Sequence, residues 1–374
     1  MINLNGGVLL FGLGELGNHI LNFLVRTPRI KMVTTADINE ERGICLTYQA
    51  MYGAFTEGLF PNVRFYKADL MNVEETAHLI RKVKPEVICS TAIIRAWFLR
   101  QPLSEEVQKK FEVEGFGGLA PIHSLNLLLP YKLMKAVKES GVETKVVITS
   151  LPDVTCPVLG KVKLTPTVGG GNFDLRVPWI KKIVSDDLKI PASNVSIYLV
   201  AHHAWGYHFG ECPYWIKIIC CGDDVTNKFP PEKLLPRLSD LHSRTYIHLG
   251  GPLGDSGMYY QQAIASSFVR NIRALYFDTG EIVHAPGPAG LPGGYPVRLS
   301  SVGAEIVLPE EISLKEAIKI NEDGGIYDGI EQIEDDGTLR CTDGTFLKFC
   351  EIEDTAKKIM QILRKHESQN PHTD

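Results

Sequence analysis

Short apolar runs alternate with longer segments of helical periodicity through the first part of the chain. The runs have the length of strands, and we expect strands at 7–11, 31–36, 63–67, 87–91 and 145–149. Between them, apolar residues recur at helical spacing, which predicts helices at 15–25, 42–51, 73–83 and 125–140. Strands that alternate with helices are typical of an α/β fold with a doubly wound parallel sheet, the Rossmann arrangement.

The pattern changes after residue 152. A stretch rich in Gly and Pro covers 157–172, and its composition favours loops. Beyond it we expect helices at 177–188, 258–276 and 354–366, strands at 195–200 and 304–308, and turn-rich hairpins within 321–348. This mixture indicates a second domain of α+β type. We therefore place the two domains at 1–152 and 153–374.

The composition argues against several classes of protein. The net charge of −5 is spread along the chain, whereas nucleic-acid binding requires clustered basic residues. The apolar stretches are shorter than the roughly 20 residues that span a bilayer, and we expect no signal peptide before the strand at 7–11. The eight cysteines form no C-x-x-C pair. We therefore expect reduced thiols in a cytoplasmic protein, with no metal site.

A glycine motif, G-L-G-E-L-G, lies between the first expected strand and the first expected helix. Gly12 permits a tight turn, Gly14 lets the backbone approach a pyrophosphate, and Gly17 lets the helix pack close to the sheet. The N-terminus of the helix offers unpaired N–H groups to phosphates. The motif in this context predicts that the first domain, 1–152, binds a dinucleotide.

The ends of the other strands add candidate cofactor contacts. Asp37 ends the second strand, where a carboxylate accepts hydrogen bonds from ribose hydroxyls and repels a 2′-phosphate. This favours NAD over NADP, although Arg42 could weaken the preference, and FAD is a minor rival. Thr91 and Ser150 follow the fourth and fifth strands, and we expect both at the cofactor.

The second half contains groups suited to proton transfer. His202 and His203 end the strand expected at 195–200, while Asp174 and Arg176 precede the helix expected at 177–188. An imidazole can donate and accept a proton near neutral pH. A buried carboxylate on its other nitrogen would fix the tautomer, and a guanidinium binds carboxylates in a forked geometry. Successive side chains on a strand point to opposite faces, so we expect only one histidine to face the site.

Four stretches of the chain together resemble the lactate/malate dehydrogenase superfamily. Asp37 to Gly43 (D-I-N-E-E-R-G) is similar to the end of the family's second strand. Thr149 to Val154 is similar to its T-N-P-V-D turn. Gly169 to Arg176, a helix, and then Ala201 to Ala204 (A-H-H-A) stand where the family has its catalytic Asp–Arg segment and its G-E-H-G motif. The resemblance covers about residues 1–310.

The resemblance implies a set of site residues. It makes His203 the acid/base and Asp174 the carboxylate partner of that histidine. It implies NAD as cofactor, a small-molecule substrate and a homodimer or homotetramer. The family's substrate-binding arginine falls on Val177 here, one residue past Arg176, and 313–350 has no counterpart. The substrate-binding arginines suggested by position are Arg95, Arg100 and Arg176.

Three functions stay open at this stage. The first is an NAD-dependent dehydrogenase or reductase that transfers hydride to or from a small carbonyl, hydroxy or imine compound. The second is an NAD- and metal-dependent glycosidase of the same superfamily fold, with Cys156 and His203 as candidate metal ligands. The third is a non-catalytic NAD-binding sensor or scaffold. Metal dependence would separate the second from the first, and any turnover would exclude the third.

Overall fold

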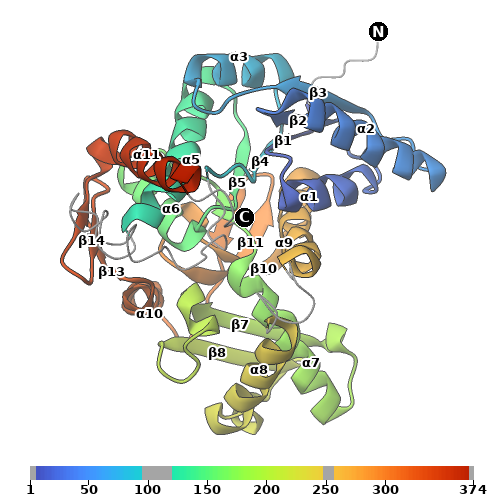
Figure 1. Ribbon diagram of the computed structural model, residues 1–374. Coiled ribbons are helices and arrows are strands. Elements are labelled where there is room, and N and C mark those ends of the chain that lie inside the picture. Colours follow the sequence, from blue (N-terminus) through green and yellow to red (C-terminus); the bar gives the residue numbers. More distant parts are fainter. Residues whose placement is uncertain (1–5, 95–119, 247–256, 370–374) are drawn as a thin grey trace.

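The computed structural model describes residues 6–94, 120–246 and 257–369 (Figure 1). Its first part is a parallel sheet with the strand order β3-β2-β1-β4-β5-β6. The strands are β1 (Val8–Phe11), β2 (Val33–Asp37), β3 (Val63–Lys67), β4 (Val87–Ser90), β5 (Lys145–Ile148) and β6 (Val168–Gly169). This order is that of a doubly wound Rossmann sheet and confirms the predicted fold class.

The helices around this sheet are α1 (Glu15–Val25), α2 (Glu40–Thr56), α3 (Val73–Val83), α5 (Ala120–Ser140) and α6 (Pro152–Lys161). The first four follow the predicted periodicity. Asn39 and Asn72 cap α2 and α3, because each side chain accepts a hydrogen bond from a backbone N–H in the first turn. The sheet continues past residue 152 through β6. The domain boundary at residue 152 stays a prediction.

The helix α6 was not predicted, because Pro157 suggested a loop. Pro152 is tolerated in the first turn of α6, where its missing N–H would have no partner in the helix. Pro157 lies inside the helix and cannot donate to the carbonyl of Asp153. Gly293 donates its N–H to that carbonyl at 3.5 Å. Tertiary contact thus satisfies a group that the local sequence leaves unpaired.

The second sheet is antiparallel, with the order β10-β11-β7-β8-β9 and β12 paired with β11. Its strands are β7 (Val195–Ala201), β8 (Tyr214–Cys220), β9 (Asp223–Asp224), β10 (Glu281–Pro286), β11 (Gly294–Ser300) and β12 (Gly303–Ile306). The helices of this part are α7 (Arg176–Leu188), α8 (Pro231–Tyr246) and α9 (Gly257–Phe277). This sheet with its helices is the predicted α+β part, although β8, β10, β11 and α8 were not predicted individually.

One hydrophobic core joins the two sheets. Helix α9 packs against α1, and its Phe268 and Ile272 belong to the same buried cluster as Val8 of β1 and Tyr295 of β11. Burying apolar side chains of both sheets in one cluster stabilises their relative placement. No helix in the described ranges is long and apolar enough to cross a membrane.

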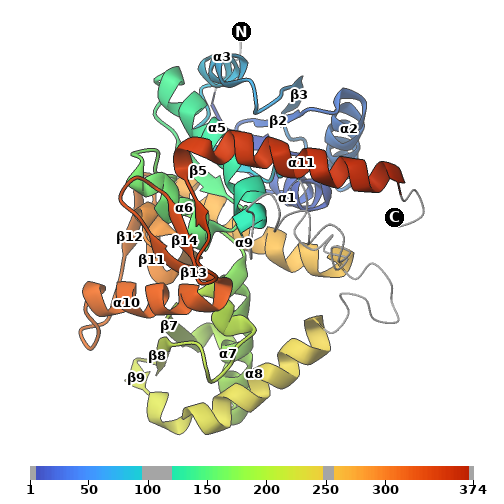
Figure 2. The same ribbon diagram turned by 60° about the vertical axis from the view of Figure 1, so that its left-hand side comes forward.

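The C-terminal segment wraps back over both parts (Figure 2). It contains α10 (Leu314–Gly325), the hairpin strands β13 (Ile330–Ile333), β14 (Leu339–Cys341) and β15 (Phe346–Leu347), and α11 (Ile352–Gln369). The predicted hairpins are present, and α10 occupies the first residues of the region expected to hold them. Helix α11 packs on α5, while α10 contacts β7. A short 3₁₀ turn, Ile326–Asp328, joins α10 to the hairpins.

We expect Gly17→Ala to lower the free energy of unfolding by about 1–3 kcal/mol, the usual cost of overpacking. A Cβ at Gly17 would lie 1.9 Å from the carbonyl oxygen of Gly12, so helix and loop would have to separate. Denaturant unfolding measures the loss. The matched control is Gly325→Ala, whose Cβ would have its nearest contact at 3.7 Å in helical backbone. Equal stability of the two variants would contradict the close packing at Gly17.

Candidate active site

The glycine loop between β1 and α1 has the geometry of a phosphate cradle. Gly12 has a φ of +86°, and its carbonyl accepts a hydrogen bond from the Thr91 hydroxyl at 2.8 Å. A Cβ at Gly14 would meet no atom within 4 Å, so the space beside this residue is open. No side chain caps α1 at Gly14, which leaves its first N–H groups for an anion. The loop therefore fits the pyrophosphate of a dinucleotide.

Asp37 lies beside this loop with its carboxylate held in place. Its Oδ2 accepts from the N–H of Leu13 at 2.6 Å, and its Oδ1 accepts from the N–H of Asn39 at 2.8 Å. Arg42 approaches Oδ1 at 3.4 Å from the solvent side. Ser150 is also buried near the edge of the sheet, but its hydroxyl donates to Asn126 at 2.8 Å. Asp37 and the glycine loop thus form one polar edge.

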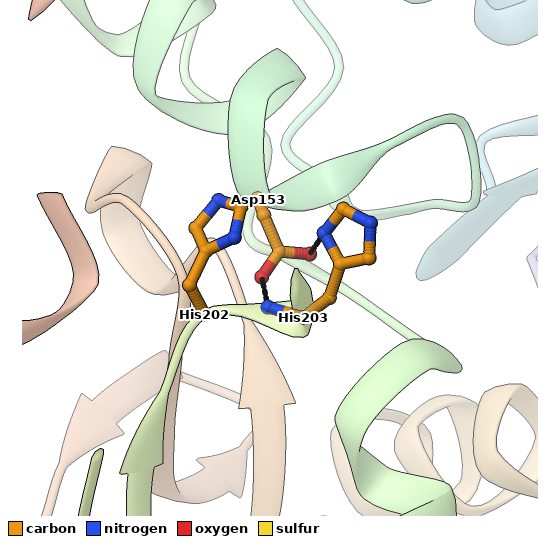
Figure 3. A group of neighbouring side chains, drawn as sticks. All are labelled: Asp153, His202 and His203. Carbon is orange, nitrogen blue, oxygen red and sulfur yellow. Dashed lines mark hydrogen bonds and ion pairs between the residues drawn. The ribbon is translucent and has the colours of Figure 1, made fainter. Parts of the chain in front are cut away.

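His203 lies between two carboxylates from different segments. Its Nδ1 is 2.8 Å from Oδ2 of Asp328, in the turn after α10, and 3.8 Å from Oδ2 of Asp153, in the first turn of α6. The backbone N–H of His203 also donates to Oδ1 of Asp153 at 3.3 Å (Figure 3). Within the described residues, the carboxylate contacts of this ring go through Nδ1. The opposite nitrogen, Nε2, is therefore the one suited to a substrate.

His202 belongs to the same group, so the expectation that only one histidine faces the site was wrong. Strand β7 ends at Ala201 and a 3₁₀ turn begins at His203, so the alternation of a strand does not apply. The two rings lie 5.1 Å apart, on either side of Asp153 (Figure 3). His202 is buried, with Nδ1 at 3.6 Å from Asp328.

The environment separates the protonation of the two rings. Burial alone would lower the pKa of His203, but the Asp328 and Asp153 carboxylates outweigh burial and raise this pKa to about 9. Burial lowers the pKa of His202 despite the same carboxylates. The pKa of Asp328 is held low, because the neighbouring histidines outweigh its burial. At neutral pH, His203 is therefore the charged ring and His202 the neutral one.

Arg176 is the predicted substrate-binding residue that the structure brings to this group. It begins α7, is buried, and stacks over Trp179 at 4.4 Å, with the Tyr207 ring at 6.0 Å. Its positive charge opposes protonation of His203 and of His242. The other two predicted substrate-binding residues, Arg95 and Arg100, lie outside the described residues.

Asp174 does not hold His203 as the resemblance implied. Its Oδ1 accepts a hydrogen bond from Nη2 of Arg270 at 2.6 Å, and the two side chains form an ion pair. The physical reason lies in packing, since Arg270 extends from α9 to the 3₁₀ turn that contains Asp174. The carboxylates on His203 are those of Asp153 and Asp328.

The group also has the spacing of a cation site. Asp153, His202 and His203 each present a ligand atom, and these atoms lie within 4.8 Å of one another. Cys156, one turn after Asp153 on α6, is not part of this set. Its thiol points toward Gly287, where an added Cβ would lie 2.5 Å from Sγ. Burial and then the Asp153 charge raise the pKa of this thiol.

Sequence reasoning overlooked Asp153 and Asp328 as functional residues. A signal for Asp153 existed, because it follows β5 at the carboxyl edge of the parallel sheet, where ligands collect. No comparable signal exists for Asp328, which lies in a turn-rich segment far along the chain from His203. The packing of α10 against β7 brings it to the site.

Comparison with known proteins gives a fold but no close relative. No protein-family model and no curated protein matches the sequence. A lactate dehydrogenase from a Medee basin deep-sea metagenome library is 15% identical, with a TM-score of 0.61 over 87% of this chain and 97% of that one. The minor L-lactate dehydrogenase of Enterococcus mundtii is 14% identical, with a TM-score of 0.58 over 86% and 96%.

Malate dehydrogenase from Plasmodium falciparum is also similar in structure. It is 12% identical, with a TM-score of 0.56 over 96% of this chain and 99% of that one. The chain therefore has a divergent form of the fold of lactate and malate dehydrogenases, with a Rossmann sheet and a second α+β part.

We expect the protein to bind NAD more tightly than NADP. Asp37→Ser should weaken NAD binding by about 10- to 100-fold, since a hydrogen bond to a charged group contributes roughly 1.5–3 kcal/mol. Arg42→Ala is the matched control and should widen the preference for NAD, because it removes the cation beside Asp37. Calorimetric titration with both dinucleotides measures these effects. Equal affinity of the unmodified protein for NAD and NADP would contradict this role of Asp37.

Proposed function

We propose that the protein is an NAD-dependent oxidoreductase that transfers hydride to or from a small carbonyl, hydroxy or imine compound. One observation carries the proposal. Asp153, in the first turn of the helix after β5, contacts His203 in the 3₁₀ turn that follows β7 of the second sheet. Because β5 belongs to the parallel sheet that bears the glycine loop, this contact brings a proton-transfer group to the edge where a dinucleotide would bind.

The residues have distinct roles in this proposal. The glycine loop and Asp37 hold the dinucleotide, which supplies or accepts the hydride when bound. His203 gives a proton from Nε2 to the substrate oxygen or nitrogen in reduction, and takes it back in oxidation. Buried Arg176 contributes positive charge beside His203, which favours a substrate with an anionic group. Arg95 and Arg100 are proposed as further substrate contacts.

A panel of small 2-oxo acids, hydroxy acids and imines, assayed through NADH absorbance, tests this function. With any substrate found, His203→Asn should lower turnover by about 10²–10⁴-fold, the usual contribution of a positioned acid/base. NAD affinity should hold. His202→Asn is the matched control and should lower turnover much less. His202 accepts a hydrogen bond from the backbone N–H of Ala204 at 3.4 Å, and an asparagine side chain can still accept this bond. If His202 proves essential and His203 dispensable, the assignment is wrong.

A metal-dependent glycosidase is the second candidate, because Asp153, His202 and His203 have the spacing of a cation site. The position of Cys156 argues against the thiol–imidazole pair expected for that candidate. The Nδ1 atom of His203 already forms an ion pair with Asp328 at 2.8 Å. A chelator that abolishes turnover would favour the glycosidase. Complete absence of turnover would favour a sensor.

We also propose that the chain acts in the cytoplasm as a homodimer or homotetramer. All eight cysteines are free thiols, which fits a reducing compartment. Helix α2 exposes a line of large apolar side chains at helical spacing, and exposed apolar surface of this kind marks interfaces. The residues of this line are Ile44, Tyr48, Tyr52 and Phe55. Sedimentation analysis of the full chain measures the oligomeric state.

A further inference from the structure

We propose that Asp328, from the C-terminal segment, is the main positioning residue for the His203 ring. Asp153 has the same role through a longer, weaker contact. The assignment rests on the proposed function and adds to it, because it makes the segment after residue 312 part of the active site. It also replaces the Asp174–His203 pair that the resemblance implied.

The contacts of the three carboxylates show which one is best placed to orient His203. Asp328 contacts Nδ1 of His203 at 2.8 Å, the length of a charge-assisted contact, and Asp153 approaches the same atom at 3.8 Å. Asp174 forms its ion pair with Arg270. The negative charges of both carboxylates favour a proton on Nδ1, the atom through which the two ion pairs run. The ring orientation thus depends first on Asp328.

The segment around Asp328 is built to hold this position. A capping box of Ser313 and Glu316 fixes the start of α10. Near its end, Gly324 lies against His202, where an added Cβ would be 2.5 Å from the histidine Cβ, so only glycine permits this approach. The hydroxyl of Tyr327 donates to the carbonyl of Glu211 at 3.0 Å. The turn that carries Asp328 is therefore anchored on both sides.

The charges around His203 make it a proton donor at neutral pH. Its raised pKa means that it is protonated until about pH 9. A bound dinucleotide would supply the hydride in reduction, and His203 would give its Nε2 proton to the substrate oxygen or nitrogen and be left neutral. The titratable and charged groups around this ring and its carboxylates include Asp328, Asp153, His202, Arg176, Tyr207, His123, Cys156, Cys212 and Tyr295.

The decisive experiment is an NMR pH titration of the full chain carrying isotope-labelled histidine, with the His203 signal assigned through His203→Asn. Removing an opposite charge at this distance lowers a pKa by about 1–3 pH units. In Asp328→Asn, we expect the pKa of His203 to fall by that amount from about 9. Asp153→Asn should move it less, and Asp174→Asn should leave the midpoint in place. Asp335→Asn is the control for the loss of one negative charge from the same segment. Asp335 is exposed and pairs with Lys161, so this variant should leave the pKa of His203 unchanged.

An unchanged midpoint in Asp328→Asn, or an equal fall in Asp174→Asn, would overturn the assignment. So would a divalent metal found in the purified protein and lost in Asp328→Asn, because the group would then be a metal centre. The titration needs neither cofactor nor substrate. A protein that shows the expected fall but binds no NAD would contradict the proposed function and leave the role of Asp328 standing.

Discussion

The contact of one imidazole with two carboxylates is the interaction on which the site depends. Asp153 comes from the helix after β5, His203 from the 3₁₀ turn after β7, and Asp328 from the turn after α10. Three parts of the chain therefore meet at Nδ1 of a single ring. Burying charges without partners is costly, so this meeting is stable only while all three are present. The hydrophobic core shared by α1, α9 and the two sheets stabilises the relative placement of the two sheets.

The carboxylates that contact His203 come from other segments than the one that the family pattern implies. The 3₁₀ turn before α7 keeps an acidic residue, Asp174, but Arg270 of α9 binds it. The orienting carboxylates then come from α6 and from the C-terminal segment. Leu339 and Leu347 in the hairpins of this segment belong to the same buried cluster as side chains of the parallel sheet, α5 and α6. Its helix α10 packs against β7, which brings Asp328 to the site.

Local chemistry made much of the first domain predictable. The glycine loop, the alternation of strands with helices and Asp37 follow from spacing and periodicity, which depend on neighbours in the sequence. Helix α6 was missed because the carbonyl opposite Pro157 finds its partner, Gly293, only in the folded chain. His202 was misjudged because β7 ends one residue before it. Asp328 was beyond sequence reasoning, since its contact with His203 joins segments that only tertiary packing brings together.

The central claim is that the dinucleotide edge and the His203 group form one active site. A crystal structure of the full chain with NADH tests it most directly. The account predicts the pyrophosphate against Gly14, the ribose hydroxyls on Asp37, and the nicotinamide ring facing Nε2 of His203 with room for one small carbonyl group between them. A nicotinamide ring directed away from His203, or a metal ion between Asp153, His202 and His203, would contradict the account.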